Sequence, residues 1–405
     1  MLRKVFIAII RRIVRFCSML LPIDKSKVCV CCFAGKSTYN CNPKYICDEL
    51  IRLKPNTLII LGIDTLILGE SSLRNLPPQI KTCDIHSIKW EYHLLTSLVW
   101  IDNHRKTFWK KRSKTLYVNT WHGSGLIKKC EGDSPNALSN DYIKLAKKDS
   151  KNIDVLLSDC DAMTDFLLHR FWYSGYVMDC GYARYKPLFE NHQETKIAVL
   201  KEFGISTNKR IILYTPTFRS DYSLDAYNLD SESIINACSI KFGGEFVFLY
   251  RFHPNLIKKF KNQIRSFKNC YNASYFNDVQ LLLASADVLI SDFSSTIFDF
   301  TICKKPAFRY IADLDEYIND RNTCYPLDSY PWPLCRNSKD LIKEIESFEQ
   351  NKYNMKVQAY YSLLGFKSAY DAYSIQANFI FDYMERKLTK EALFSKYKAY
   401  LRKAN

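Results

Sequence analysis

Short apolar runs alternate with amphipathic stretches along the first half of the chain. Continuous apolar and β-branched residues predict strands at 28–35, 57–63, 97–102, 115–121, 154–159 and 176–181. Helical periodicity marks 42–53 and 161–173, with Asn42 and Asp161 as the predicted N-caps. Strands buried on both faces of a parallel sheet have such uninterrupted apolar runs, so this region is expected to be an α/β domain.

A second series of alternating elements begins near residue 195. It predicts helices at 196–203, 233–242, 279–286 and 294–302, and strands at 210–216, 245–252, 287–291 and 306–311. Two successive series predict two doubly wound, Rossmann-like α/β domains facing one another across a cleft. The expected ranges are 26–190 and 195–375, with a hinge at 183–208 and a basic, helical tail at 376–405.

Length and charge narrow the class of protein. A chain of 405 residues is longer than one domain with a single hydrophobic core usually is, so two domains are expected. Its 58 Lys and Arg residues against 42 Asp and Glu residues give a formal net charge of +16. This charge favours polyanionic partners such as nucleic acid, anionic membrane or phosphorylated substrates. The 15 cysteines are odd in number and scattered through apolar runs, which indicates free thiols in a reducing cytoplasm.

Residues 1–25 predict a basic amphipathic helix. Lys4, Arg11 and Arg15 fall on one side of it, and the opposite side carries Phe6, Ile9, Ile13, Phe16 and Leu20. Arginines interrupt the apolar run, so neither a spanning helix nor a signal peptide is expected. The pattern favours contact with an anionic membrane surface. The alternative is a terminal helix that packs its apolar side on the protein.

Four short motifs follow predicted strands, where open α/β sheets bind their ligands. They are "WHGSG" at 121–125, "TPTFR" at 215–219, "RFHPN" at 251–255 and "SDFSST" at 291–296. The last motif opens a helix, and free amides and hydroxyls at a helix start suit a phosphate. Plain N-capping by serine is the alternative for this motif.

Other charged and titratable residues are assigned simpler roles. Lys128 and Lys129 are expected on a solvated helix face. The remaining histidines lack a comparable context and are expected to be structural or exposed: His86, His93, His104, His169 and His192. Asp161 of "DCD" is better used as a helix cap and Asp313 of "DLD" lies in a loop, so no metal site is expected. The chain has neither GxxxxGK nor GxGxxG, and no cofactor is expected.

Taken together, these motifs resemble a known family. "NTWHGSGLIKK", "LYTPTFRSD", "RFHPN" and "SDFSSTIFDF" resemble, in order, the signatures of the CDP-glycerol glycerophosphotransferases, which are teichoic-acid and capsule polyol-phosphate transferases. The similarity spans about residues 28 to 350. The chain departs from the family pattern in three places: Gly125 replaces a proline, "GYARYK" replaces "GYPRND", and Asn322 replaces a glycine.

The resemblance implies a GT-B-like fold whose N-terminal domain binds the acceptor and whose C-terminal domain binds the donor. It implies catalytic roles for His122 and His253. The residues implied in donor and phosphate binding are Thr217, Arg219, Asp292, Ser294, Ser295 and Thr296, and those on the acceptor side are Trp121, Gly123 and Ser124.

The implied reaction transfers a polyol phosphate, glycerol phosphate first, from a CDP-polyol to a hydroxyl of a lipid-linked or oligomeric acceptor, and it releases CMP. The place expected for it is the cytoplasmic face of a bacterial membrane, with no nucleic-acid partner. The main alternative is a GT-B glycosyltransferase that uses a nucleotide sugar in capsule or lipopolysaccharide synthesis. A non-catalytic binder of nucleic acid or membrane is the third hypothesis. The motifs do not distinguish glycerol from ribitol.

Overall fold

A computed structural model describes residues 2–69, 73, 76–106, 111–134, 136, 138–190, 192–217, 219, 227, 229–252, 269–321, 323–367, 369–386 and 388–403. The chain forms two compact units. Unit 1 comprises Met1–His122, Leu138–Lys186 and Lys367–Asn405, and unit 2 comprises Gly123–Ala137 and Pro187–Phe366. The chain therefore changes unit immediately after His122, and again after residues 137, 186 and 366.

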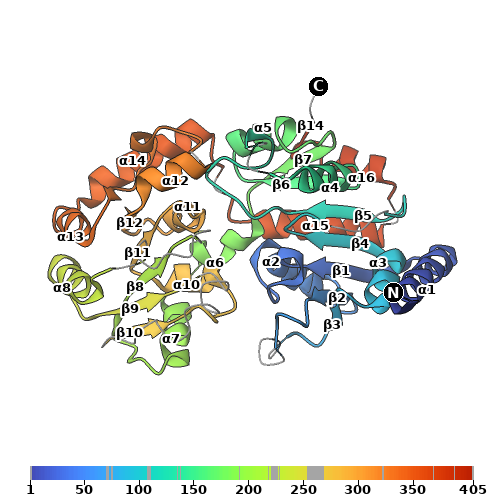
Figure 1. Ribbon diagram of the computed structural model, residues 1–405, viewed down its shortest axis with the longest axis horizontal. Coiled ribbons are helices and arrows are strands. Elements are labelled where there is room, and N and C mark those ends of the chain that lie inside the picture. Colours follow the sequence, from blue (N-terminus) through green and yellow to red (C-terminus); the bar gives the residue numbers. More distant parts are fainter. Residues whose placement is uncertain are drawn as a thin grey trace. The chain divides into compact units, whose positions relative to one another are not determined.

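Unit 1 is built on a twisted sheet that is parallel except at one edge (Figure 1). Its strands are β1 (Asp24–Cys31), β2 (Leu58–Ile63), β3 (Ile80–Asp84), β4 (Ser97–Asp102), β5 (Leu116–Asn119), β6 (Val155–Ser158), β7 (Tyr176–Asp179) and β14 (Leu401–Lys403). Within the described residues the order is β14-β7-β6-β5-β4-β1-β2-β3, and β14 is antiparallel to β7. The strand order reverses between β1 and β4, which is the arrangement of a doubly wound fold.

Helices and buried apolar side chains complete unit 1. Its helices are α1 (Leu2–Leu20), α2 (Cys41–Leu53), α3 (Ile88–Thr96), α4 (Asn140–Ser150), α5 (Asp161–His169), α15 (Ala372–Glu385) and α16 (Lys390–Lys396). Helix α2 packs against α15, and α1 packs against α3. Cys29 and Cys31 lie in the core with free thiols, and burial raises the pKa of each thiol to about 12. These cysteines therefore act as small hydrophobic residues.

Unit 2 repeats the same plan with a parallel sheet. Its strands are β8 (Arg210–Thr215), β9 (Phe246–Tyr250), β10 (Cys270–Asn272), β11 (Val288–Ser291), β12 (Ala307–Tyr310) and β13 (Leu334–Cys335). Among the described residues their order is β10-β9-β8-β11-β12-β13. The order reverses between β8 and β11, and the register pairs Thr215 with Ser291 at the carboxyl ends of these two strands.

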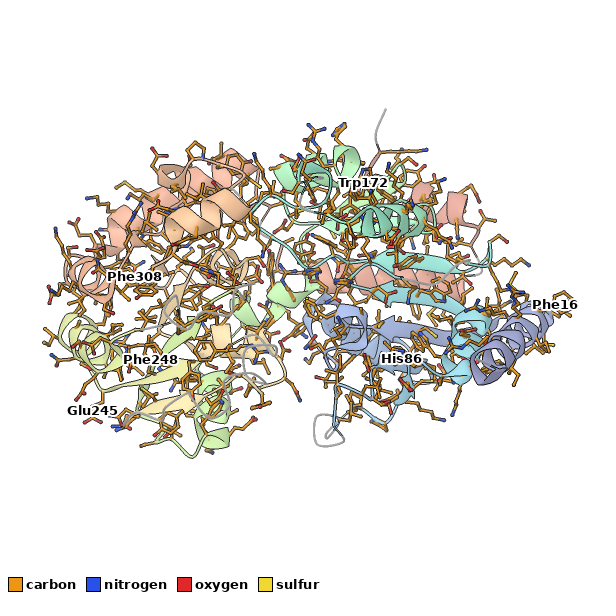
Figure 2. All side chains as sticks on the ribbon, viewed as in Figure 1. Phe16, His86, Trp172, Glu245, Phe248 and Phe308 are labelled. Atoms are coloured by element: carbon orange, nitrogen blue, oxygen red, sulfur yellow. The ribbon has the colours of Figure 1, made fainter. Side chains whose placement is uncertain are left out.

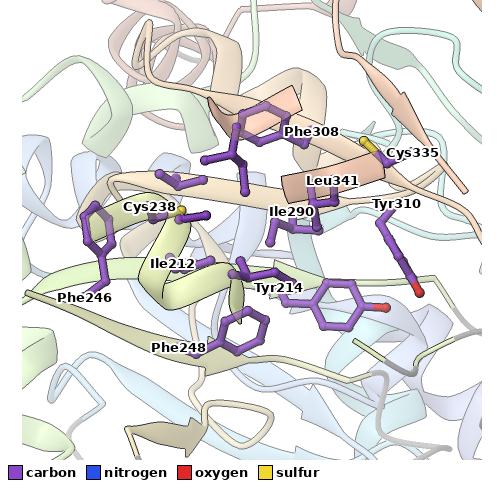
Figure 3. Packing of buried hydrophobic residues seen from close by; sticks show 14 residues of the cluster. Ile212, Tyr214, Cys238, Phe246, Phe248, Ile290, Phe308, Tyr310, Cys335 and Leu341 are labelled. Atoms are coloured by element: carbon purple, nitrogen blue, oxygen red, sulfur yellow. The ribbon is translucent and has the colours of Figure 1, made fainter. Parts of the chain in front are cut away.

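Helices pack against this second sheet. They are α7 (His192–Glu202), α8 (Ser231–Phe242), α10 (Val279–Ser285), α11 (Thr296–Thr301), α12 (Leu314–Arg321), α13 (Ser338–Glu346) and α14 (Gln350–Leu364); α6 (Lys186–Phe189) spans the unit boundary. Figure 3 shows the core, in which Ile212 and Ile290 of the sheet pack with Cys238 of α8 and Leu341 of α13.

Two predicted helix caps are wrong. Helix α2 has Asn40 at its N-cap position, because the side chain of Asn42 is used in contacts with the chain around residue 120. Helix α5 is capped by the sulfur of Cys160, which accepts from the amide of Met163. Asp161 lies in the first turn of α5 and pairs instead with Lys367.

The predicted helical tail is only partly correct. Helices α15 and α16 form, but the last described residues extend as β14, where Leu401 pairs with Met178 of β7. Residues 367–405 complete unit 1, whereas the sequence placed 367–375 in the second domain. Likewise 123–137 falls in unit 2, although it was predicted to lie within the first domain. Sequence alternation missed these exchanges because it carries no information on which sheet a segment joins.

The orientation of helix α1 differs from the alternative in which this helix packs its apolar side on the protein. Arg15 donates to both carboxylate oxygens of Glu91 on α3, at 2.6 and 2.9 Å, and Arg11 donates to the His86 carbonyl. Ile13, Phe16 and Leu20 are 56%, 68% and 73% exposed, and Figure 2 shows Phe16 on the outer side of α1. Arg11 and Arg15 thus pack on the protein, whereas Ile13, Phe16 and Leu20 face outward. Across the described residues, none of the helices has the length and apolarity to cross a membrane.

Candidate active site

The first candidate site lies where the strand order of unit 1 reverses. Phe33 follows β1, and Asn103 and His104 follow β4, so these residues share the carboxyl edge of the sheet. His122 reaches the same place from the end of β5. A doubly wound sheet binds ligands at this edge and at this point of the strand order.

The imidazole of His122 is held in a defined orientation. Its Nδ1 lies 2.5 Å from the backbone carbonyl oxygen of Asn103. A carbonyl oxygen only accepts, so Nδ1 carries a hydrogen and proton exchange with a substrate falls to Nε2. The ring stacks on His104 with centroids 5.6 Å apart at 9°, and it contacts Phe33 at 5.2 Å. This arrangement suits a general base.

His104 was expected to be structural or exposed; it is partly exposed and stacks on His122, a contact that the sequence did not predict. It lies beside His122 because "DNHRK" begins at the carboxyl end of β4, adjacent to β5. Polar residues directly after the strand "SLVWID" were the available signal. The sequence alone does not state that this strand neighbours the one before His122.

The segment after β4 is anchored on both sides of His104. Asp102 and Lys106 form a buried ion pair at 2.9 Å. Burial raises the pKa of the Asp102 carboxyl, although the Lys106 charge opposes this. Arg105 donates to Ser150 Oγ at 2.8 Å and stacks over the Phe171 ring at 3.5 Å. The segment that contacts His122 is therefore firmly held.

Trp121 belongs to the core of unit 1 more than to its surface. Its side chain is 7% exposed and meets Phe171 edge-on, with centroids 4.7 Å apart. Its backbone has φ 51°, in the left-handed region that bulky residues rarely adopt. Contact with an acceptor stays a prediction for this residue.

The glycine-rich turn after His122 docks within unit 2. Ser124 Oγ donates to Asp299 of α11 at 2.6 Å, and the other oxygen of Asp299 accepts from Gln280 of α10 at 2.9 Å. Tyr360 of α14 donates to the carbonyl of Gly125 at 2.5 Å. Ser124 is buried, so its observed role is to hold the turn on α11. The acceptor contacts predicted for Gly123 and Ser124 stay predictions.

Gly125 is required by its surroundings. Its φ is +68°, and an added Cβ would lie 2.6 Å from the Phe298 ring. A residue with a side chain, including the proline of the family pattern, does not fit this position without movement. The expected helix face for Lys128 and Lys129 is also absent, because Lys128 instead forms an antiparallel bridge with Thr323.

The second candidate site lies where the strand order of unit 2 reverses, between β8 and β11. Thr217 and Arg219 follow β8, and Asp292 and Ser294 follow β11. The Asp292 carboxylate accepts from the Thr217 amide at 2.9 Å, from the Thr217 hydroxyl at 2.7 Å and from the Ser294 amide at 3.2 Å. Asp292 thus ties the two predicted donor-binding segments together.

Arg219 is buried between two carboxylates and is not a surface cation. Its Nη1 donates to Asp292 at 2.8 Å, and its Nε and Nη2 donate to Asp313 at 2.5 and 3.0 Å. Burial alone would lower the pKa of the guanidinium, but the charges of Asp292 and Asp313 outweigh it and raise that pKa. The hydroxyl of Tyr227 accepts from the Arg219 amide at 2.9 Å. Neither Asp313 nor Tyr227 was predicted for the site.

The hydroxyls that open α11 remain half-exposed. Ser295 occupies the N-cap position but makes no side-chain cap bond, so plain serine capping does not describe it. Ser294 Oγ accepts from the Thr296 amide at 3.4 Å and from its hydroxyl at 2.9 Å. These three residues therefore present their polar groups at the carboxyl edge of the sheet.

His253 lies outside the described residues, and its predicted role stays a prediction. The neighbouring Arg251 donates to the carbonyls of Ala273 and Phe276, and burial lowers the pKa of its guanidinium to about 10. In the part of the chain that the structure describes, no cluster of three His, Cys, Asp or Glu side chains is arranged for a metal ion.

Comparison with known proteins assigns the family. A family model described as CDP-Glycerol:Poly(glycerophosphate) glycerophosphotransferase matches residues 13–386. The chain belongs to this glycerophosphotransferase family. The match includes both points of strand-order reversal and every predicted site residue.

Curated members of the glycerophosphotransferase family share about a quarter of their residues with this chain. A teichoic acid poly(glycerol phosphate) polymerase of Bacillus subtilis is 26% identical over 83% of the chain, which spans only 46% of that protein. A protein of the same description from Bacillus spizizenii is 27% identical over 84% of this chain and 88% of its own length.

A solved structure confirms the fold class. The wall teichoic acid polymerase TagF, in a form soaked with CDPG, superposes with a TM-score of 0.80 at 22% identity, covering 96% of this chain and 98% of that chain. The likeness confirms the predicted GT-B-like α/β class with parallel sheets, and the expected N-terminal helix is present. The cleft between the two domains stays a prediction.

Proposed function

We propose that this protein transfers glycerol phosphate from CDP-glycerol to a hydroxyl of a lipid-linked or oligomeric acceptor and releases CMP. One observation carries the proposal: the glycerophosphotransferase family match over residues 13–386. The local geometry supports the roles of individual residues. A polymer of the teichoic-acid type is the product class that the names of the relatives suggest.

In the proposed reaction the acceptor oxygen attacks the phosphorus that bears glycerol. The bond from this phosphorus to the oxygen bridging to CMP breaks, and CMP leaves with the electron pair. His122 accepts the acceptor proton at Nε2, because Nδ1 is engaged with Asn103. Such a transfer needs little covalent help, but it needs positioning and neutralisation of charge.

The donor phosphates are assigned to the opening of α11 and to the segment after β8. Ser294, Ser295 and Thr296 lie there partly exposed, and Asp292 links them to the β8 segment because it accepts from the amides of both Ser294 and Thr217. Arg219 contributes by holding Asp292 and the Thr217 segment in place, since its guanidinium is already occupied by two carboxylates. His253 is retained as the second candidate catalytic residue.

A donor panel tests the reaction. Purified protein is incubated with CDP-glycerol, CDP-ribitol and several nucleotide sugars, with and without a lipid-linked glycerol phosphate oligomer, and the released nucleotide is measured. We expect CMP from CDP-glycerol, increased by the acceptor. Nucleotide release only from a nucleotide sugar would favour the glycosyltransferase hypothesis. CMP release only from CDP-ribitol would mean that the transferred group is ribitol phosphate and not glycerol phosphate.

We further propose that α1 attaches the protein to the cytoplasmic face of an anionic membrane. Ile13, Phe16 and Leu20 form an exposed apolar stripe, and Arg12 is exposed beside it. Arg11 and Arg15 were expected to meet lipid headgroups, but both are engaged with α3 or the segment before it. Insertion of the apolar stripe, assisted by Arg12, therefore carries the proposed attachment.

Aspartate at Ile13 and Phe16 is expected to weaken binding to phosphatidylglycerol vesicles by roughly tenfold or more, because each side chain loses about 1.5–3 kcal/mol of burial in lipid. Sedimentation with vesicles measures this. Ile240 on α8 is 76% exposed and provides a matched control, since Ile240→Asp should leave binding unchanged. Equal losses in both variants would contradict attachment through α1.

A further inference from the structure

Three buried asparagines surround the turn that carries His122. Asn42 comes from α2, Asn103 follows β4 and Asn119 ends β5, and all three are 0% exposed. None of them belongs to the predicted catalytic or binding residues. A buried amide has an oxygen that accepts and a nitrogen that donates, and in Asn42 and Asn119 both groups bond to backbone, so each of these two side chains links separate backbone segments.

The turn itself is held in an unfavourable backbone conformation. Trp121 has φ 51°, which costs a bulky residue on the order of 1–3 kcal/mol unless its surroundings impose it. Asn119 Oδ1 accepts from the Trp121 amide at 2.9 Å. Asn42 Nδ2 lies 3.4 Å from the Trp121 carbonyl, and the Thr120 hydroxyl donates to the same carbonyl at 2.9 Å. These contacts set the direction in which the chain enters His122.

Asn119 also holds the segment that contacts the imidazole. Its Nδ2 donates to the His104 carbonyl at 3.0 Å. The same segment supplies the Asn103 carbonyl, which accepts from His122 Nδ1, and the His104 ring, which stacks on His122. One amide group therefore fixes both the backbone that delivers His122 and the carbonyl that orients its ring.

We propose that Asn119 is a positioning residue that keeps the His122 imidazole in its Nδ1–H tautomer, so that Nε2 is the nitrogen that takes the acceptor proton. The catalytic part of this inference rests on the proposed function. An amide is needed because one oxygen must accept and one nitrogen must donate. Aspartate has the same shape but offers two acceptors, so it would turn an oxygen toward the His104 carbonyl and weaken the link.

NMR of histidine nitrogens tests the tautomer without any activity. The chain has only 7 histidines, and the His122 signals are assigned by their loss in His122→Asn. We expect wild-type neutral His122 to be in the Nδ1–H form. In Asn119→Asp we expect a mixture of tautomers. An Nε2–H form in the wild type would overturn the proposal whether or not any variant folds.

Kinetics test the consequence for catalysis. In Asn119→Asp we expect kcat for CMP release to fall about 10- to 100-fold, as for a misplaced catalytic group, with KM for CDP-glycerol within about twofold. Asn152→Asp is the control, because Asn152 is a partly exposed asparagine of unit 1 that follows α4, and its side-chain amide donates to the Lys148 carbonyl at 3.4 Å. A variant that keeps the wild-type tautomer and kcat would overturn the proposal. A fixed tautomer in a wild-type protein that releases no CMP would contradict the proposed function and support the positioning role.

Discussion

Replacing His122 by alanine is expected to lower kcat for CMP release at least about 100-fold, since a general base contributes roughly 10²–10⁴ in rate. The half-buried ring contacts Phe33, His104 and the Asn103 carbonyl, so its removal leaves the sheet intact. Acceptor-dependent CMP release from CDP-glycerol, measured under saturating donor, provides the readout.

His86→Ala is the matched control for this variant. His86 lies in the same unit, its side chain is 52% exposed, and it pairs with Asp64 at 3.3 Å. Its loss should leave kcat unchanged, and both variants should unfold at the wild-type temperature. Turnover of His122→Ala close to the wild-type value would remove His122 from the mechanism.

The second large effect concerns stability. Arg219→Met is expected to destabilise unit 2 by about 3–5 kcal/mol, because it leaves Asp292 and Asp313 close together without their cation. Adding Asp313→Asn to this variant should recover part of the loss. Trp332 is the only tryptophan in the sequence of unit 2, so its fluorine signal after 5-fluorotryptophan labelling reports unfolding of that unit in urea.

Arg336 provides the control for Arg219. It pairs with Asp315 at 3.3 Å in the exposed part of the same unit, and an exposed pair contributes only about 0–1 kcal/mol. Arg336→Met should therefore shift the urea midpoint very little. If Arg219→Met shifted the urea midpoint as little as Arg336→Met, the buried ion pairs of Arg219 would not organise the donor segment as proposed.

Local patterns predicted the central strands of both sheets, but they missed β3, β10, β13 and β14 and did not give the strand order. Apolar runs located β1, β4, β8 and β11 to within a few residues, because buried parallel strands must be apolar on both faces. Their neighbours in the sheet follow from helix crossovers and tertiary packing, which periodicity does not record. The proximity of His104 to His122 depends on that order and was missed for this reason.

Charged residues show the same limit. Arg219 was predicted to face phosphate, yet its partner Asp313 lies 94 positions away and no local signal connects the two. In α1 the amphipathic pattern was visible, but a pattern alone does not say which side faces the protein. The arginine side faces the protein because Arg15 pairs with Glu91, which lies 76 positions later on another helix. Long-range ion pairs thus determine the partners and orientations of charged side chains, which local motifs do not specify.

The exchange of segments between the units has a consequence for biosynthesis. Strand β14 closes the edge of the first sheet against β7, and α15 covers α2, yet both are translated after the whole of unit 2. The first unit therefore stays incomplete on the ribosome until residues 367–403 have emerged. Until then α2, whose Asn42 side chain contacts the Thr120 and Trp121 carbonyls beside His122, lacks the helix that packs on it.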